Sequence, residues 1–208
     1  DTETIVHAYE EYGDACVQHF RGMFAFAVWD SRRERLFLAR DRVGKKPLFL
    51  YEHDGSLLFA SEIKSLLQYP QLDVRVDLTA VAEYLAYRYV PGPSTLFGNI
   101  VKLQPGCCAV WENGNVRKWS YYTPPDCEIL ADVVLPTDPV GAFLEKLEEA
   151  VSLRMVSDVP FGAFLSGGID SSAIVGLMSR HSDHPVKTLS VGFEESAYSE
   201  LRYARTIA

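Results

Sequence analysis

The sequence has few cysteines and no long apolar run. Its 208 residues include four cysteines, Cys16, Cys107, Cys108 and Cys127, and their spacing does not give the C-x-x-C pair of a zinc or thioredoxin-like site. Reduced thiols in a cytoplasmic protein are therefore expected. The longest apolar run, residues 23–29, is far shorter than the roughly 20 residues that cross a bilayer, so we expect no membrane span and no membrane partner.

Basic residues are also in the minority. The chain has 20 Lys and Arg against 28 Asp and Glu, a net charge of −8, and the basic residues are dispersed. Nucleic-acid binding needs clustered Lys and Arg to neutralise phosphates, so no nucleic-acid partner is expected. No charged-then-apolar leader follows Asp1, and residues 199–208 resemble a helix that has barely begun. We therefore expect the chain to be a fragment of a longer protein.

Short apolar runs separated by turn residues dominate residues 1–125. Apolar residues near the start share one helical face, and an Asn113-Gly114 pair between two apolar runs is typical of a β-hairpin. This region is expected to be α+β with mostly antiparallel strands. Strands are predicted at 23–29, 35–39, 48–51, 57–60, 107–111 and 116–121, and further helices at 62–67 and 78–87.

Residues 123–139 contain four prolines and show weak periodicity, which is typical of a linker between domains, and we place this linker at 126–139. The region that follows, 140–208, begins with an amphipathic helix at 140–155. Strand, helix and strand at the spacing seen here form a βαβ unit, so this region is expected to be the start of an α/β domain with a parallel sheet. Its strands are predicted at 163–165 and 188–191, and the helix between them at 170–180.

The most informative segment joins the strand at 163–165 to the following helix. Backbone N–H groups at a helix N-terminus are unpaired and the helix dipole is positive there, so a loop in this position can bind anions. Its glycines would let phosphate oxygens approach the main chain, and its serines offer hydroxyl donors. These residues are Gly167, Gly168, Ser166, Ser171 and Ser172.

Asp170 lies in the first turn of that helix, where a carboxylate can cap the helix or hold a Mg²⁺ ion that bridges phosphates. The Lys of a Walker loop is missing, so the pattern does not match that type of phosphate site. A plain strand-to-helix turn, with Ser and Asp as caps, is the structural alternative. If the loop binds phosphate, Val in place of Gly167 is expected to fill the space of the phosphate oxygens.

The loop resembles the S-G-G-x-D-S pyrophosphate loop (PP-loop) of the N-type ATP pyrophosphatases, and residues 155–165 are similar to the segment that precedes this loop in asparagine synthetases. The resemblance implies that ATP and Mg²⁺ bind here and that ATP is cleaved between its α and β phosphates. It also implies an apolar slot for adenine, for which core packing is the alternative. The ATP-binding residues implied are Phe164, Ser166, Gly167, Gly168, Asp170, Ser171, Ser172 and Val191, with Asp170 as the metal ligand.

Residues 21–27, 39–48 and 60–66 are similar to the glutaminase domain of the same family. The resemblance implies that residues 1–125 are part of a class II glutamine amidotransferase domain with an Ntn-hydrolase-like fold. It also implies that Asp1, in an Asp-x-Glu pattern, binds the α-amino group of glutamine, with capping of the first helix as the alternative. Arg40 and Asp41 are expected to pair across a turn.

The family hydrolyses glutamine with an N-terminal Cys, alongside an Arg and an Asn-Gly segment, and none of these is found at a matching position. We therefore predict no catalytic residue within the chain, and expect that it does not cleave glutamine alone. The acceptor-binding half of the synthetase domain is expected to follow Ala208. The sequence leaves the roles of Ser61, Glu62 and Lys64 open.

For the whole protein, the resemblance implies a glutamine-dependent asparagine synthetase with glutamine, aspartate and ATP as substrates. Ammonia from glutamine would attack an aspartyl adenylate, giving asparagine, AMP and pyrophosphate. One alternative is a related amidotransferase that acts on another carboxylate, such as a peptide, cell-surface or antibiotic precursor. Another is a nucleotide-binding remnant without catalysis. The sequence also leaves a homodimer open.

Overall fold

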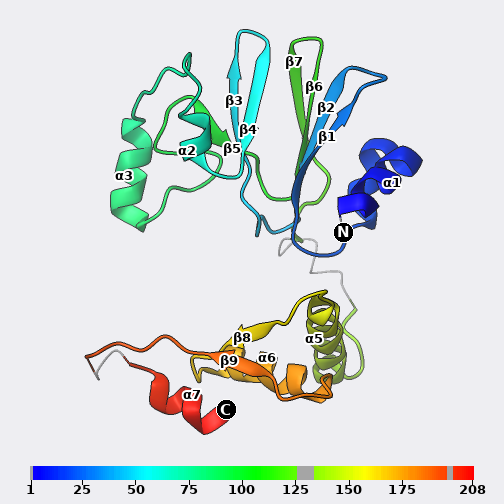
Figure 1. Cartoon of the computed structure of the whole chain (residues 1–208), viewed down its shortest axis with the longest axis vertical. Coiled ribbons are helices and arrows are strands. Elements are labelled where there is room, and N and C mark those ends of the chain that lie inside the picture. The colour runs from blue at the N-terminus through cyan, green and yellow to red at the C-terminus, as the bar shows by residue number, and fades with distance from the viewer. Residues whose placement is uncertain (1, 126–133, 196–198) are drawn as a thin grey trace. The chain divides into compact units, whose positions relative to one another are not determined.

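Residues 2–125, 134–195 and 199–208 are described by the computed structural model, in which the chain divides into two units (Figure 1). The first unit spans Asp1–Cys127 and the second Glu128–Ala208. Most of the predicted linker, at 126–133, lies outside the described residues, and so do Asp1 and Cys127. The last residue of that linker, Pro139, is already the first residue of a helix.

The first unit contains two antiparallel sheets, with strand orders β1-β2-β6-β7 and β4-β3-β5. This confirms the prediction of mostly antiparallel strands. The strands are β1 (Ala25–Asp30), β2 (Arg35–Arg40), β3 (Phe49–His53), β4 (Ser56–Ala60), β5 (Ile100–Lys102), β6 (Cys107–Glu112) and β7 (Asn115–Ser120). The helices are α1 (Thr2–Tyr12), the 3-10 helix η1 (Gly13–His19), α2 (Ile63–Leu66) and α3 (Leu78–Tyr87).

The predicted hairpin joins β6 to β7. Glu112 pairs with Asn115, so only Asn113 and Gly114 form the turn, and their φ values are +49° and +76°. Two residues with positive φ match the right-handed twist of the strands, which is why an Asn-Gly pair is favoured in this position.

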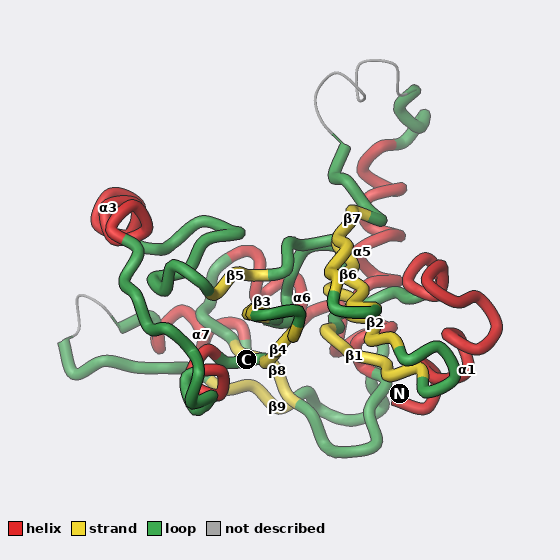
Figure 2. Tube along the Cα trace, turned by 90° about the horizontal axis from the view of Figure 1, so that it is seen from above, coloured by secondary structure: helices red, strands yellow, loops and turns green. Residues whose placement is uncertain are grey.

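Strand β2 is buried on both of its faces. Phe37 and Ala39 pack with buried residues of η1 and with side chains of α1, whereas Leu38 packs with Leu50 of β3. On the far face of the second sheet, Tyr51 packs with side chains of α2. The first unit is therefore layered as helix, sheet, sheet and helix. The strands of the two sheets can be followed in Figures 1 and 2, and Figure 1 shows α1 and α2 on their outer sides.

The second unit contains two parallel strands, β8 (Gly162–Phe164) and β9 (Lys187–Leu189), joined through helix α6 (Ile169–Arg180). This confirms the predicted βαβ unit. Helix α5 (Pro139–Met155) packs on α6 through a cluster that includes Val151, Leu177 and Met178, and α7 (Leu201–Ile207) follows at the end. Across the described part of the chain, every helix is too short or too polar to cross a membrane.

The layering makes Leu38 a test of the first unit, because this side chain is fully buried between the two sheets. Leu38→Ala is expected to lower the free energy of unfolding by about 3 kcal/mol, the usual cost of deleting a buried isobutyl group and leaving a cavity. Urea titration followed by tryptophan fluorescence measures this, since Trp29, Trp111 and Trp119 all lie in the first unit. Val43→Ala, at a side chain that is 68% exposed, is the control and should change stability by less than about 0.5 kcal/mol.

Candidate functional site

The predicted phosphate loop connects the end of β8 to the start of α6. Leu165, the first residue after β8, is buried; its N–H donates to the carbonyl of Leu189 at 2.8 Å, and its carbonyl accepts from Ser190 Oγ at 2.6 Å. The loop is thus anchored to β9 on one side. Since β8 and β9 are parallel, it lies at the carboxyl edge of the sheet, where ligands of α/β proteins gather.

Two serine hydroxyls make bonds inside the loop itself. Ser166 Oγ and Ser171 Oγ are 3.1 Å apart, and each also contacts Gly168, through its N–H at 3.3 Å and its carbonyl at 3.2 Å respectively. Ser172 differs, because its Oγ is buried and makes no hydrogen bond within the described residues. A buried hydroxyl without a partner is unfavourable, and this sets Ser172 apart from the other two serines of the loop.

The outer side of the loop is open. Gly168 is the residue before the first turn of α6, and no side chain caps that turn. Ile169 is 89% exposed and Asp170 is exposed beside it. The Ser or Asp cap that the plain-turn alternative assumed is therefore not found, since the residue before the first turn is Gly168 and the 12-residue helix starts without a side-chain cap.

Gly167 faces the other way, toward α7. Its φ is +84°, and a Cβ built on it would lie 2.5 Å from the backbone of Tyr203 and Ala204. The predicted effect of Val at this position therefore needs a correction. The added side chain would meet α7 rather than phosphate oxygens, so that substitution tests packing and not ligand binding.

Phe164 and Val191 lie near the ends of β8 and β9 and are 77% and 68% exposed. Neither belongs to the buried clusters of the described second unit. Asp170 is not part of a metal cluster: among the described residues, no group of three or more His, Cys, Asp and Glu side chains could hold an ion.

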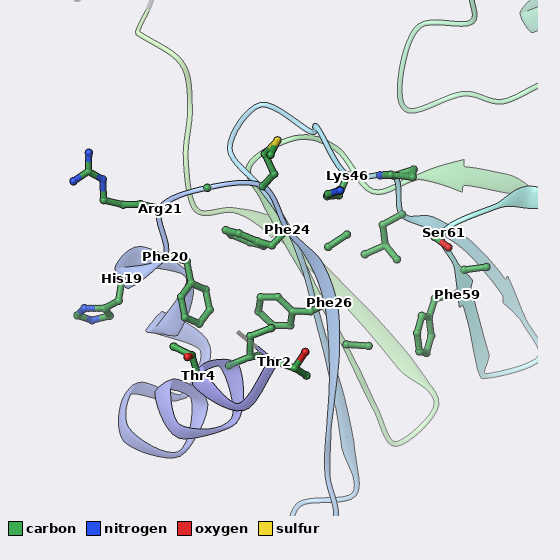
Figure 3. A pocket seen from close by; sticks show the side chains of 18 residues that line it. Thr2, Thr4, His19, Phe20, Arg21, Phe24, Phe26, Lys46, Phe59 and Ser61 are labelled. Atoms are coloured by element: carbon green, nitrogen blue, oxygen red, sulfur yellow. The ribbon is translucent and has the colours of Figure 1, made fainter. Parts of the chain in front are cut away.

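The first unit contains a cavity of about 800 Å³ beside the first turn of α1. Its walls come from α1, from residues 19–27, from 46–48 and from 59–61, so parts of all three glutaminase-like motifs meet there. Figure 3 shows Phe24 and Phe26 on one side of the cavity, and Phe59 and Ser61 on the other. No local sequence pattern indicates that these motifs converge, because they are separate along the chain.

Asp1 lies outside the described residues, so the structure does not place it, but its neighbour Thr2 lines the cavity. Ser61 lines it as well. Lys64 Nζ lies 2.6 Å from Glu62 Oε2, and both side chains are largely exposed.

Arg40 and Asp41 come shortly before the cavity-lining residues 46–48 in the chain. The expectation that these two side chains pair with each other is wrong. The Arg40 guanidinium donates to three backbone carbonyls, and the fully buried Asp41 carboxylate accepts from four backbone N–H groups. Burial opposes ionisation of Asp41, yet the backbone donors outweigh it and hold the pKa of this carboxyl below its ordinary value.

The three cysteines that the structure describes, Cys16, Cys107 and Cys108, are poor nucleophiles. Burial raises the pKa of Cys16 to about 11 and that of Cys108 to about 12, and burial raises the pKa of Cys107 as well. All three are free thiols. A thiol whose pKa is raised in this way is protonated at neutral pH.

Comparison with known proteins defines the family. Residues 1–122 match the family model of a glutamine amidotransferase domain, and residues 142–208 match that of asparagine synthase. A Bacillus subtilis protein named glutamine-hydrolysing asparagine synthetase 3 is 38% identical over 94% of the chain, and a putative glutamine-hydrolysing asparagine synthetase 2 from Methanocaldococcus jannaschii is 34% identical over the whole chain. The chain belongs to the glutamine-hydrolysing asparagine synthetase family.

The chain spans only 32% of the B. subtilis protein and 40% of the M. jannaschii protein. A member with a different name is also similar: Amidase chry2 of Gibberella zeae is 34% identical over 86% of the chain, which covers 26% of that protein. The cavity lies within the segment of this chain that matches the glutamine amidotransferase domain. The loop lies within the segment that matches asparagine synthase.

Gly167 is the sharpest test of how the loop is held. Gly167→Ala is expected to destabilise the second unit by about 3 kcal/mol, because Ala disfavours positive φ and its methyl group meets the α7 backbone. Gly176→Ala is the matched control: this glycine is inside α6 with open space around it, so Ala should stabilise slightly. Hydrogen exchange of the α6 and α7 amides measures both, and equal effects of the two variants would contradict the α7 contact.

The lowered pKa of Asp41 gives a pH-dependent test. Asp41→Asn is expected to lower the free energy of unfolding by about 3 kcal/mol at pH 7, because the amide group meets N–H donors that the carboxylate accepted. A carboxyl whose pKa is lower when folded stabilises above its unfolded pKa of about 3.9 and loses that contribution as pH falls. The difference in the free energy of unfolding between the unsubstituted protein and Asp41→Asn should thus stay constant from about pH 7 to 5 and become smaller below about pH 4. Urea titrations of both proteins across this pH range measure this difference. A difference that stayed constant below about pH 4 would show that folding does not lower the pKa of Asp41.

Proposed function

We propose that the chain is part of a glutamine-dependent asparagine synthetase. In this reaction glutamine hydrolysis supplies ammonia, and ATP activates the β-carboxylate of aspartate, giving asparagine, AMP and pyrophosphate. The observation that carries the proposal is an open helix N-terminus at the carboxyl edge of the parallel strands, within the segment that matches asparagine synthase. Activation is needed because hydroxide is a poor leaving group, whereas AMP is a good one.

The loop residues fit a pyrophosphate group. Gly168, Ile169 and Asp170 are exposed at the uncapped start of α6, where backbone N–H groups would bind phosphate oxygens, and the buried, unpartnered Ser172 hydroxyl would donate to the bound ligand. Ser166 and Ser171 would exchange long bonds within the loop, of 3.1 to 3.4 Å, for charge-assisted bonds to phosphate oxygens.

The proposed positions of adenine and of the metal ion lie at the same carboxyl edge of the parallel strands β8 and β9. We assign the adenine to the exposed side chains of Phe164 and Val191, since an apolar ring offsets the cost of their exposure. Asp170 would hold Mg²⁺, which neutralises phosphate charge and polarises the bond that breaks. A carboxylate by itself is a normal magnesium ligand, because this ion keeps waters and takes its other ligands from substrate phosphates.

The cavity of the first unit is the proposed glutamine site. Its volume of about 800 Å³ is that of a small-molecule site, and it lies in the segment that matches a glutamine amidotransferase domain. We place the α-amino group of glutamine at Asp1, the residue before the cavity-lining Thr2. The layering as helix, sheet, sheet and helix supports an Ntn-hydrolase-like fold, and the free thiols Cys16, Cys107 and Cys108 support a cytoplasmic location.

A second candidate is an amidotransferase of the same family that acts on another carboxylate. The similarity to Amidase chry2 favours keeping it, because a family member with this name need not use aspartate. The chemistry at the loop would be the same in both cases. Only the acceptor differs.

Exchange of labelled pyrophosphate into ATP, measured on the full-length protein, tests this function. Exchange is expected to depend on aspartate and Mg²⁺, and Asp170→Asn should reduce it about 10- to 100-fold while raising the Mg²⁺ requirement. Asp183→Asn is the matched control, because Asp183 is an exposed carboxylate just beyond α6, and it should leave exchange unchanged. Glutamine hydrolysis should be the same in both variants.

The outcomes separate the candidates. Exchange that ignores aspartate but responds to another carboxylate would establish the second candidate. If Asp170→Asn exchanged as fast as Asp183→Asn, the metal assignment would be wrong. Absence of any exchange in the unsubstituted protein would contradict the adenylate chemistry itself.

A further inference from the structure

Asp41 is a fully buried carboxylate for which the proposed reaction has no chemical role. It lies in the loop between β2 and β3. Oδ1 accepts from the N–H groups of Val43 at 3.2 Å and Lys45 at 2.9 Å, and Oδ2 accepts from those of Lys46 at 3.0 Å and Phe24 at 3.3 Å. One carboxylate therefore joins its own loop to the segment that leads into β1.

The main chain of Asp41 strengthens this junction. Its N–H donates to the Phe24 carbonyl at 2.8 Å, and its carbonyl accepts from the N–H of Gly106 at 2.9 Å, just before β6. Three segments distant in sequence are thus tied at one residue.

Arg40 holds the same loop from its other side. Nε donates to the Lys46 carbonyl at 2.7 Å, Nη2 to the Gly44 carbonyl at 2.8 Å and Nη1 to the Leu103 carbonyl at 2.6 Å. Gly44 has a φ of +68°, and a Cβ there would lie 2.8 Å from Pro105 and 3.1 Å from the guanidinium carbon of Arg40. The loop has little freedom to move.

Two of the tied residues, Phe24 and Lys46, line the cavity from different segments. The Asp41 carboxylate accepts hydrogen bonds from the N–H groups of both Phe24 and Lys46. These two bonds therefore set the distance between the two parts of the cavity wall. Burying a carboxylate costs free energy that a packing role alone does not require, because an apolar side chain would fill the same space. The donors that surround Asp41 give the charge a specific geometric role.

We propose that Asp41 and Arg40 are positioning residues for glutamine binding: they hold the 41–46 loop against Phe24 and so fix the shape of the cavity. This rests on the proposed function, in which that cavity receives glutamine. Neither residue touches the substrate. Their effect is on its affinity, and chemistry in the synthetase segment does not depend on them.

The experiment compares glutamine-dependent and ammonia-dependent synthesis by the full-length protein. Asp41→Asn is expected to raise KM for glutamine about tenfold with kcat changed less than about threefold, because a displaced wall weakens binding of substrate and transition state alike. Ammonia-dependent synthesis should stay within about twofold. Thr95→Val is the matched control: Thr95 is buried, and its Oγ1 bonds Phe97 and Ile100, which do not line the cavity, so KM for glutamine should not change.

Arg40→Lys is a second variant with the same readout, in case Asp41→Asn does not fold. Lys keeps the charge but lacks the planar fork that reaches three carbonyls, so KM for glutamine should again rise. An unchanged KM in both folded variants, or an equal rise in Thr95→Val, would overturn the positioning role while leaving the proposed function intact. If the unsubstituted protein hydrolysed no glutamine at all, the proposed function and this inference would both fail.

Discussion

Burial of both faces of β2 is the constraint on which the first unit depends. Because successive side chains of a strand point to opposite faces, Phe37, Leu38 and Ala39 can all be buried only if something apolar covers each side. Helices cover one side and the second sheet the other. The antiparallel register then pairs Ala25 with Arg40, so the chain entering β1 and the chain leaving β2 emerge at the same end of the sheet. The cavity is built where they meet.

The second unit uses a parallel pair for a comparable purpose. Pairing Phe164 with Leu189 brings two strand ends to one edge, and α6 starts from that edge with uncapped amides. The loop is shaped by backbone contacts on three sides: β9 anchors Leu165, the first turn of α6 fixes Gly168, and α7 presses on Gly167. In the proposed reaction, the remaining open side of the loop receives the phosphates of ATP.

Local patterns in the sequence predicted what local physics decides. The Asn113-Gly114 hairpin, the βαβ unit and the loop at Gly167 and Gly168 all follow from short-range periods and turn residues, and the structure contains each of them. Long-range partners were not predictable. Arg40 and Asp41 are neighbours of opposite charge, which suggested a pair, but their partners include Leu103 and Phe24, distant residues that no local pattern connects with them. The contact of Gly167 with α7 was hidden for the same reason.

Polar side chains have the same structural role in the loop of the second unit and around the cavity of the first. In the loop and around the cavity, polar side chains such as Ser171 and Asp41 bond mainly to the protein itself and thereby shape backbone surfaces. The buried thiols are also structural groups. With pKa values of about 11 and about 12, only roughly one part in 10⁴ or less of Cys16 and Cys108 is thiolate at pH 7. Hydrolysis of glutamine needs a nucleophile with a far lower pKa, so in the proposed reaction these buried thiols serve packing and another group attacks the substrate.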